Sequence, residues 1–254
     1  MSRRWLVLEP EITIEEYLRI REDVTTFLEE KAKTNITSFD RLPTKQHQKI
    51  VLKNAELVYE RSKIIEPMIT SNLFGLYEEG ISEFKSLEHR IKDIEGIKRK
   101  IISDSKDYDG SYSDAASNLR DGVRYTIVLP EELYVLKTDE YLHKLEDMGY
   151  VVEEFKNCWG KPLYQGFNVI IKCPKTDDYF ELQFHTPYGY QIKEGSTRDL
   201  YQVVRDDDMS KEVIELKKKA NKLRRIFQAS VPIPEGAKEY RFSSDKRLVV
   251  GGLK

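Results

Sequence analysis

Over residues 178–186, polar side chains with catalytic potential alternate with large apolar ones. Successive side chains of a strand point to opposite faces, so this pattern predicts a strand with one buried face and one polar face. A carboxylate, an amide and an imidazole on one face could bind a substrate and move a proton. The polar residues are Tyr179, Glu181, Gln183 and His185, and the apolar ones are Phe180, Leu182 and Phe184.

The preceding strand segment, 166–173, is separated from this one by a short turn, which predicts a hairpin. Tyr164, Gly166 and Asn168 share one parity there, so the hairpin would present tyrosine, amide, carboxylate and imidazole groups on a common face. That face could form the floor of a cleft. The alternative is a polar face that is merely solvated.

Residues 90–100 carry a second set of candidates, which are cationic: Arg90, Lys92, Arg99 and Lys100. On a helix, Lys92 and Arg99 share a face, and Lys100 lies near Arg90 after almost three turns. Arg90 and Lys92 could instead precede the helix on an extended segment. Cations at the entrance to a helix form a plausible polyphosphate site. The alternative is a solvated basic helix face.

Asp121 stands before a β-rich segment, 123–129, that Pro130 ends. An aspartate beside a glycine at such a place is most often part of a turn. If Glu181 lies nearby, however, the two carboxylates could hold a magnesium ion bound to the phosphates of a nucleotide.

The order and spacing of these residues resemble the synthetase domain of RelA/SpoT-like alarmone synthetases, and more closely its short toxin-type members. The resemblance covers about residues 84–206 and includes four motifs in the family's order. A trailing Glu and Tyr find counterparts in Glu194 and Tyr201. The matching positions of the four motifs are Arg90, Lys92, Ile97 and Lys100; Asp121, Gly122, Val123 and Arg124; Tyr164, Gly166 and Asn168; and Glu181, Gln183, His185 and Thr186.

The chain departs from the family pattern at several positions. Glycines stand at 96 and 166 where the family has serine, Asn168 replaces histidine, and His185 replaces arginine. Asp121 lies three residues before Arg124 instead of five, which keeps the strand parity. These departures leave the acceptor open.

The resemblance implies an ATP-dependent pyrophosphokinase that transfers the β,γ-pyrophosphate of ATP to a 3′-hydroxyl. The acceptor would be GDP, GTP, an adenosine nucleotide, or the 3′ end of an RNA such as tRNA. Mg²⁺ would be held by Asp121 and Glu181, which are also the implied catalytic residues. The implied ATP-binding residues are Arg90, Lys92, Lys100 and Arg124. The implied acceptor-binding residues are Tyr164, Asn168, Gln183, His185 and Lys161. Two alternatives stay open: an inactive nucleotide-binding or interaction protein of the same fold, and a nucleotidyltransferase that transfers a nucleoside monophosphate.

The period of the hydrophobic pattern predicts an α+β fold, with a mixed, partly antiparallel sheet flanked by helices. We expect an N-terminal helical region (1–80), a synthetase domain (81–208) and a C-terminal basic helix with a tail (209–254). Within these, the patterns predict helices over 46–66, ended by Pro67, and over 82–102, 139–148, 190–204 and 210–227. A further helix begins at the capping box of Thr13 and Glu16. Strands are predicted at 123–129, 151–155, 166–173 and 178–186, and a mobile loop at 103–117.

Composition limits the remaining function classes. The chain has 254 residues, of which 34% are charged, with a net charge of −2, and this balance gives no global argument for nucleic acid or membrane binding. Two cysteines exclude a disulfide framework, and His47, His89 and His143 are too isolated for a histidine metal site. We expect a cytoplasmic protein with no membrane segment.

Two regions outside the motifs suggest partners. The helices within 11–80 are either a scaffold for the catalytic core or a docking surface for an antitoxin or another regulatory protein. The helix over 210–227 carries a basic stripe that includes Lys217, Lys219 and Lys222. Such a stripe is usually solvated, but it could hold the phosphates of a tRNA acceptor.

Overall fold

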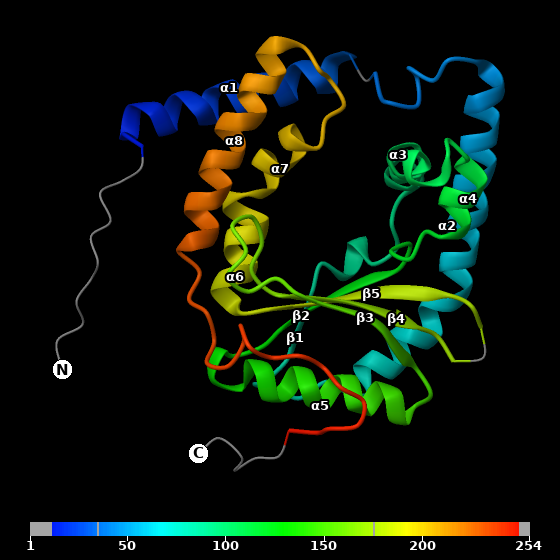
Figure 1. Ribbon diagram of the computed structural model, residues 1–254, viewed down its shortest axis with the longest axis vertical. Coiled ribbons are helices and arrows are strands. Elements are labelled where there is room, and N and C mark those ends of the chain that lie inside the picture. The colour runs from blue at the N-terminus through cyan, green and yellow to red at the C-terminus, as the bar shows by residue number, and fades with distance from the viewer. Residues whose placement is uncertain (1–11, 35, 175, 249–254) are drawn as a thin grey trace. The chain divides into compact units, whose positions relative to one another are not determined.

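The computed structural model describes residues 12–34, 36–174 and 176–248, and it contains a five-stranded mixed sheet (Figure 1). The spatial order is β1-β2-β5-β4-β3. β2 and β5 pair in parallel, whereas the other neighbours are antiparallel. This sheet and the helices around it confirm the predicted α+β class. The strands are β1 (Glu83–Lys85), β2 (Arg124–Val128), β3 (Val151–Asn157), β4 (Phe167–Lys172) and β5 (Tyr179–His185).

One face of the sheet is apolar and carries the core. Phe180, Leu182 and Phe184 are fully buried, as their alternation with polar residues predicts. Helix α5 (Tyr134–Asp147) covers this face, as Figure 1 shows. The buried Tyr134 hydroxyl donates to the carbonyl oxygen of Phe184 at 2.7 Å and accepts from the amide of Phe167 at 3.1 Å. The helix therefore fixes both strands of the predicted hairpin.

Three helices pack together beside the sheet and form their own apolar cluster. They are α2 (Lys45–Phe74), α3 (Ile94–Asp104) and the short α4 (Tyr112–Ser117). Val51, Ala55 and Val58 of α2 meet Ile97 and Ile101 of α3 in this cluster. This packing fixes the position of α3, which begins just after Arg90 and Lys92.

The prediction that Pro67 ends the second helix is wrong, because α2 continues through it to Phe74. A proline inside a helix removes one backbone hydrogen bond. Here Pro67 lies on the exposed side of the helix, where water can satisfy the released carbonyl group. Ile65, Ile69 and Leu73 stay buried on the other side and hold the following turns in place.

The prediction of one helix over 82–102 is also wrong. This stretch contains β1, the 3₁₀ turn η1 (Leu87–His89) and then α3. Ser86 adopts a left-handed conformation with φ of 55°, which breaks any continuous helix. Asp93 is the N-cap of α3, where its side chain accepts from the amide of Gly96 at 2.5 Å.

The segment 103–117 is not the predicted loop. It folds into the 3₁₀ turn η2 (Ser105–Tyr108) and helix α4. Ala115 and Ala116 are buried against α2 and α3, and Tyr108 and Tyr112 pack on the edge of the same cluster. Small and aromatic residues thus supply the apolar surface that the many serines and aspartates of this segment conceal in the sequence.

A second group of helices combines one helix from the N-terminal part of the chain with two from the C-terminal part. It contains α1 (Ile14–Thr34), α7 (Arg198–Val204) and α8 (Lys211–Ala229). Thr13 caps α1 as predicted, with its hydroxyl accepting from the amide of Glu16 at 3.1 Å. The predicted helix over 190–204 is interrupted: α6 (Pro187–Gln191) is followed by a π-helical turn, η4 (Ile192–Ser196), before α7.

Contacts divide the chain into two compact units. The helical unit combines the described part of Met1–Asn35 with Gln191–Val231, and the sheet unit combines Ile36–Tyr190 with the described part of Pro232–Lys254. These units cut across the segments 1–80, 81–208 and 209–254, whose boundaries stay a prediction. Among the described residues, every helix is too short or too polar to span a bilayer.

Candidate active site

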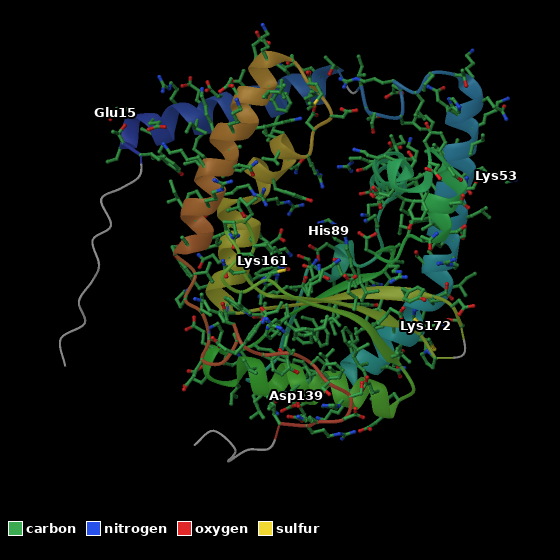
Figure 2. All side chains as sticks on the ribbon, viewed as in Figure 1. Glu15, Lys53, His89, Asp139, Lys161 and Lys172 are labelled. Carbon is green, nitrogen blue, oxygen red and sulfur yellow. The ribbon has the colours of Figure 1, made fainter. Side chains whose placement is uncertain are left out.

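The polar face of the sheet brings several candidate residues into adjacent positions. Arg124 of β2 pairs with Glu181 of β5, and Thr126 pairs with Gln183. On the other side of β5, Asn168 of β4 is also opposite Gln183. Residues paired directly across strands share a face, so these side chains all lie opposite the buried Phe180, Leu182 and Phe184. Figure 2 shows the two sides, with His89 above the sheet and Asp139 of α5 below it.

Glu181 is held at the centre of this face by two amide side chains. Asn168 donates its Nδ2 to one carboxylate oxygen at 2.7 Å, and Gln183 donates its Nε2 to the other at 2.7 Å. Each oxygen keeps lone-pair capacity for a further contact. The carboxylate is therefore oriented by its neighbours yet still able to accept a proton or bind a cation.

Lys92 and Asp121 form a second, more deeply buried centre beside it. The Lys92 ammonium lies 2.5 Å from Asp121 Oδ2, and the exposed fraction of the Lys92 side chain is 9%. Lys92 lies before α3, beside the entry to β2, where its amide donates to the carbonyl of Gly122 at 2.9 Å. The structure thus agrees with the alternative in which Arg90 and Lys92 precede the helix.

The charges around this pair connect it to the rest of the site. Burial raises the pKa of Asp121, but the charges of Lys92, Lys100 and Arg124 outweigh burial and hold that pKa below its ordinary value. Burial lowers the pKa of Lys92, while the carboxylates of Asp121 and Glu181 act to raise it. Both carboxylates and all three cations therefore act within one electrostatic cluster.

The carboxylates of this cluster suit a magnesium ion. Asp121 Oδ1 is buried and accepts no hydrogen bond from any described residue, so one hard oxygen ligand is available there. Within the described ranges no three His, Cys, Asp or Glu side chains gather into a metal site. Mg²⁺ nevertheless needs only one or two carboxylates when substrate phosphates and water complete its shell. Asp121 and Glu181 fit that requirement.

Arg90 is turned toward a different partner. Its Nε lies 2.5 Å from Glu66 Oε1 on α2, and the same carboxylate accepts a short hydrogen bond from Thr70. The Thr70 hydroxyl also lies 2.6 Å from that of Tyr125, which neighbours Arg124 on the opposite face of β2. The hydrogen bond with Glu66 raises the pKa of Arg90. The structure thus ties the Arg90 guanidinium to the Glu66 carboxylate of α2.

Tyr164 and His185 form a pair further along the polar face. The Tyr164 hydroxyl lies 2.9 Å from His185 Nε2, and the ring centroids are 5.1 Å apart. His185 is only 1% exposed, whereas Tyr164 is partly exposed. Of these two predicted acceptor residues, Tyr164 is thus the one that a ligand can reach.

Lys161 lies on an exposed loop before β4, and Figure 2 shows it near the opposite end of the sheet from Lys172. Its ammonium is 3.8 Å from the Cys158 sulfur. Burial raises the pKa of the Cys158 thiol despite the nearby charge of Lys161. Contact of Lys161 with an acceptor stays a prediction.

Gly166 has a conformation that its neighbours require. Its φ is 146°, and a Cβ atom there would lie 2.6 Å from the Phe184 carbonyl oxygen and 3.0 Å from the His185 ring. We expect Gly166→Ala to lower the free energy of unfolding by about 2 kcal/mol, as measured by chemical denaturation. Gly195→Ala is the matched control, because nothing lies within 4 Å of its Cβ position. Equal stability of the two variants would contradict the requirement for glycine at position 166.

Two residues of the site escaped prediction. Thr126 occupies the polar face beside Gln183, but a threonine carries no ionisable group and so did not stand out as a candidate. Glu66 lies in the middle of a helix that precedes the motifs, and only the fold places it beside Arg90. Strand parity could have identified Thr126 once Arg124 was assigned to the polar face.

In the helical unit, most of the predicted basic stripe is engaged with neighbouring groups. Lys219 pairs with Asp23 at 3.3 Å, and Lys222 pairs with Glu16 at 3.1 Å. Lys217 donates to the backbone carbonyl oxygens of Asp206 and Asp208. These contacts use cations of α8 to bind α1 and the loop before α8.

The family counterparts Glu194 and Tyr201 also belong to this unit. Glu194 pairs with Arg198 at 3.3 Å, and the Arg224 guanidinium lies 4.9 Å from the centre of the Tyr201 ring.

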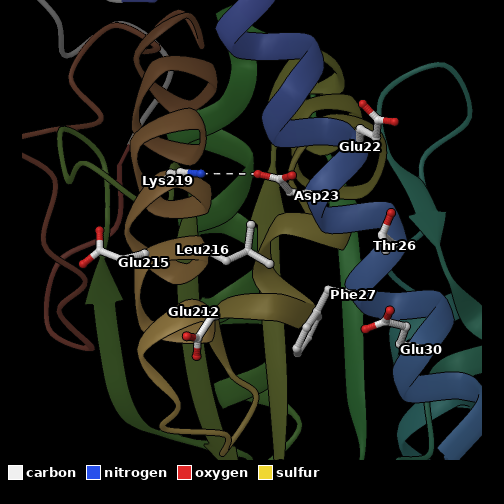
Figure 3. A pocket seen from close by; sticks show the side chains of 9 residues that line it. All are labelled: Glu22, Asp23, Thr26, Phe27, Glu30, Glu212, Glu215, Leu216 and Lys219. Atoms are coloured by element: carbon white, nitrogen blue, oxygen red, sulfur yellow. Dashed lines mark hydrogen bonds and ion pairs between the residues drawn. The ribbon is translucent and has the colours of Figure 1, made fainter.

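Between α1 and α8 runs a groove of about 520 Å³ with an apolar floor and an acidic rim (Figure 3). Phe27 and Leu216 form the floor.

Comparison with known proteins gives only distant similarities. No protein-family model matches the chain, and no curated protein matches it. Among solved structures, a GTP pyrophosphokinase family protein from Streptococcus pneumoniae has 14% identity and a TM-score of 0.42, covering 73% of this chain and 89% of that one. The small alarmone synthetases 2 and 1 from Bacillus subtilis each have 12% identity and a TM-score of 0.34; each covers 70% of this chain, and 92% and 91% of their own chains are matched. These three solved structures are named as a pyrophosphokinase family protein and as alarmone synthetases.

Proposed function

We propose that this protein is an ATP-dependent pyrophosphokinase that acts on the 3′-hydroxyl of a nucleotide or of an RNA end such as that of tRNA. The observation that supports this proposal most is the electrostatic cluster on the polar face. Lys92 forms an ion pair with Asp121, Arg124 is the strand partner of Glu181, and the charge of Lys100 acts on Asp121, which brings cations suited to a triphosphate close to carboxylates suited to a magnesium ion. The motif resemblance in the sequence gives the same class of reaction.

The cations of the cluster neutralise the phosphates of ATP. Lys100 and Arg124 are less buried than Lys92 and can contact the triphosphate. Lys92, paired with Asp121, fixes that carboxylate at the entry to β2. Phosphoryl transfer depends mainly on positioning and on stabilising the charge of the transferred group, which these fixed charges provide. When bound by Asp121 and Glu181, Mg²⁺ supplies further neutralisation of phosphate charge.

In this proposal Glu181 receives the proton of the attacking 3′-hydroxyl. The hydroxyl oxygen bonds to the β-phosphorus of ATP as the bond from that phosphorus to the α,β-bridging oxygen breaks, and AMP leaves. The hydrogen bonds from Asn168 and Gln183 fix the direction of its oxygens, so a 3′-hydroxyl within about 3 Å finds an oriented acceptor. Tyr164 stacks against the acceptor base, a contact worth about 1–3 kcal/mol. Asn168 and Gln183 hence have two roles. Each orients the Glu181 carboxylate with one side-chain N–H group, and each can donate its other N–H group to the acceptor.

Transfer assays with labelled ATP test this function. The full chain is incubated with Mg²⁺, γ-labelled or α-labelled ATP, and one acceptor at a time: GDP, GTP, ADP, ATP or bulk tRNA. Appearance of γ-label on an acceptor supports the proposal. Transfer of α-label instead identifies a nucleotidyltransferase, and no transfer to any acceptor identifies an inactive protein of this fold.

Lys100→Ala should raise the KM for ATP roughly tenfold or more, because it removes one charged contact with the triphosphate. Lys100 lies on α3, 2.9 Å from Asp104, and its charge acts on Asp121. Lys106→Ala is the control, since Lys106 is an exposed lysine just beyond α3. An unchanged KM in the Lys100 variant would remove Lys100 from the ATP site.

The proposed partners beyond substrates are a regulatory protein or antitoxin on the N-terminal helices. The exposed residues of α1 include Ile14 and Leu18, which are 76% and 58% exposed and so offer apolar contact surface. Co-purification of the full chain with a candidate partner, repeated with Leu18→Ser, tests whether α1 takes part in such binding.

A further inference from the structure

Tyr164 and His185 come from separate segments that meet on the polar face. Tyr164 lies in the loop before β4, and His185 is the last residue of β5. Their hydrogen bond is 2.9 Å long, and the two rings meet edge to face with an interplanar angle of 68°. The imidazole therefore restricts both the position of the Tyr164 hydroxyl and the tilt of its ring.

His185 itself is closed off from a ligand. It is 1% exposed, and the neighbouring Thr186 is fully buried. The backbone of Gly166 lies directly against the imidazole, since a Cβ atom there would come within 3.0 Å of the ring. A glycine at 166 thus leaves the space that a buried histidine at 185 fills. Any effect of His185 on an acceptor must pass through a neighbouring side chain.

We propose that His185 is a positioning residue, which holds the Tyr164 ring in the orientation that binds the acceptor base and does not contact the acceptor. This inference rests on the proposed function, because it assigns Tyr164 to the acceptor side. It also joins two departures from the family pattern, Gly166 and His185, into a single packing arrangement. The acceptor side consequently relies on the Tyr164 ring, oriented by a histidine at the position where the family that the sequence resembles has an arginine.

The inference predicts a particular pattern of kinetic effects. Loss of the hydrogen bond frees the ring before the acceptor binds, so the cost falls on binding and leaves the bound complex able to react. Tyr164→Phe and His185→Leu should each raise the acceptor KM roughly three- to tenfold, the size expected for one hydrogen bond, with kcat changed less than twofold. His185→Gln keeps a polar group near the hydroxyl and should retain more of the wild-type KM.

A double-mutant cycle tests the inference. The wild-type protein, Tyr164→Phe, His185→Leu and the double variant are compared by acceptor KM, by kcat, and by the dissociation constant of whichever acceptor among GDP, GTP, ADP, ATP and tRNA the wild type binds. If the bond carries the effect, the double variant is no weaker in binding than either single variant. Additive losses, a fall in kcat at unchanged KM, or a wild-type dissociation constant in both single variants would overturn the inference.

The same four proteins separate this inference from the proposed function. Binding is measured without any transfer, so non-additive losses of acceptor binding support the positioning role even if no acceptor becomes labelled. Absence of label in the wild type then rejects only the pyrophosphokinase reaction. The unfolding equilibrium constant is measured in parallel, and His185→Gln provides a second variant if the apolar leucine prevents folding. If binding falls only in proportion to the folded fraction, the positioning role is rejected.

Discussion

Glu181→Gln should reduce pyrophosphate transfer by about a thousandfold or more while the protein stays folded. The substitution removes the group proposed to accept the hydroxyl proton, a role that contributes roughly 10²–10⁴ in rate, and it also removes a proposed magnesium ligand. In addition, a glutamine amide at 181 would meet the donor groups of Asn168 and Gln183, which now point at carboxylate oxygens. The rate is measured with labelled ATP under single-turnover conditions.

Glu154→Gln provides the matched control for this variant. Glu154 lies on β3, opposite Ile170, which is itself opposite Glu181, so it occupies the same row of the sheet two strands away. It is 3.0 Å from Lys156 at the surface. We expect wild-type transfer from this control. Transfer at the wild-type rate by Glu181→Gln would show that the reaction does not need this carboxylate.

Asp121→Asn should abolish transfer and also lower the free energy of unfolding by about 2 kcal/mol. The sequence alone suggests a purely catalytic loss, but the structure shows that Asp121 is the partner of a lysine that is 9% exposed. Removing one member of a buried ion pair leaves the other charge poorly compensated. The neutral asparagine oxygen still accepts one hydrogen bond, so the cost is smaller than complete loss of the pair. Urea denaturation with circular dichroism measures it.

The stability difference should depend on pH. The pKa of Asp121 in the folded protein lies below its ordinary value of 3.8, so the folded state binds fewer protons than the unfolded state in the acid range. The stabilisation by Asp121 is therefore complete above about pH 3.8 and disappears as the pH falls through the lowered folded-state value. Wild type and Asp121→Asn should accordingly converge in stability at strongly acid pH.

Asp177→Asn serves as the control for both measurements. Asp177 pairs with Lys172 at 2.8 Å, but its side chain is almost fully exposed. Exposed ion pairs contribute little to stability, so this variant should unfold like the wild type and keep full activity. A stable and inactive Asp121→Asn protein would mean that Lys92 tolerates the loss of its partner and that Asp121 acts only in catalysis.

The strands were easier to predict than the helices around them. Alternation in 178–186 identified β5 and its polar face, because one buried face imposes a period of two on the sequence. The stretch 82–102 gave a false helix, since its break depends on the backbone of Ser86 and on the capping role of Asp93, neither of which disturbs the charge pattern. Local conformation at one or two residues decided the outcome there.

The site was predictable to the extent that it follows strand parity. Parity placed Glu181, Gln183 and Asn168 together, and register in the sheet does the same. It gave no information on Arg90, whose partner Glu66 lies on a helix distant in sequence. Nor did it indicate that His185 would be buried, because that burial depends on segments distant in sequence, such as the backbone at Gly166, that pack against the ring.

The parallel pairing of β2 with β5 has a consequence for folding. Arg124 and Glu181 become neighbours only when this pair forms, and β3 and β4 lie between the two strands in the sequence. Such long-range pairing is slow because a large loop must close first, whereas the antiparallel β3-β4-β5 ribbon can form from local contacts. A chain that has completed only the ribbon therefore carries Glu181 without its cations. Assembly of the charged cluster thus coincides with completion of the sheet.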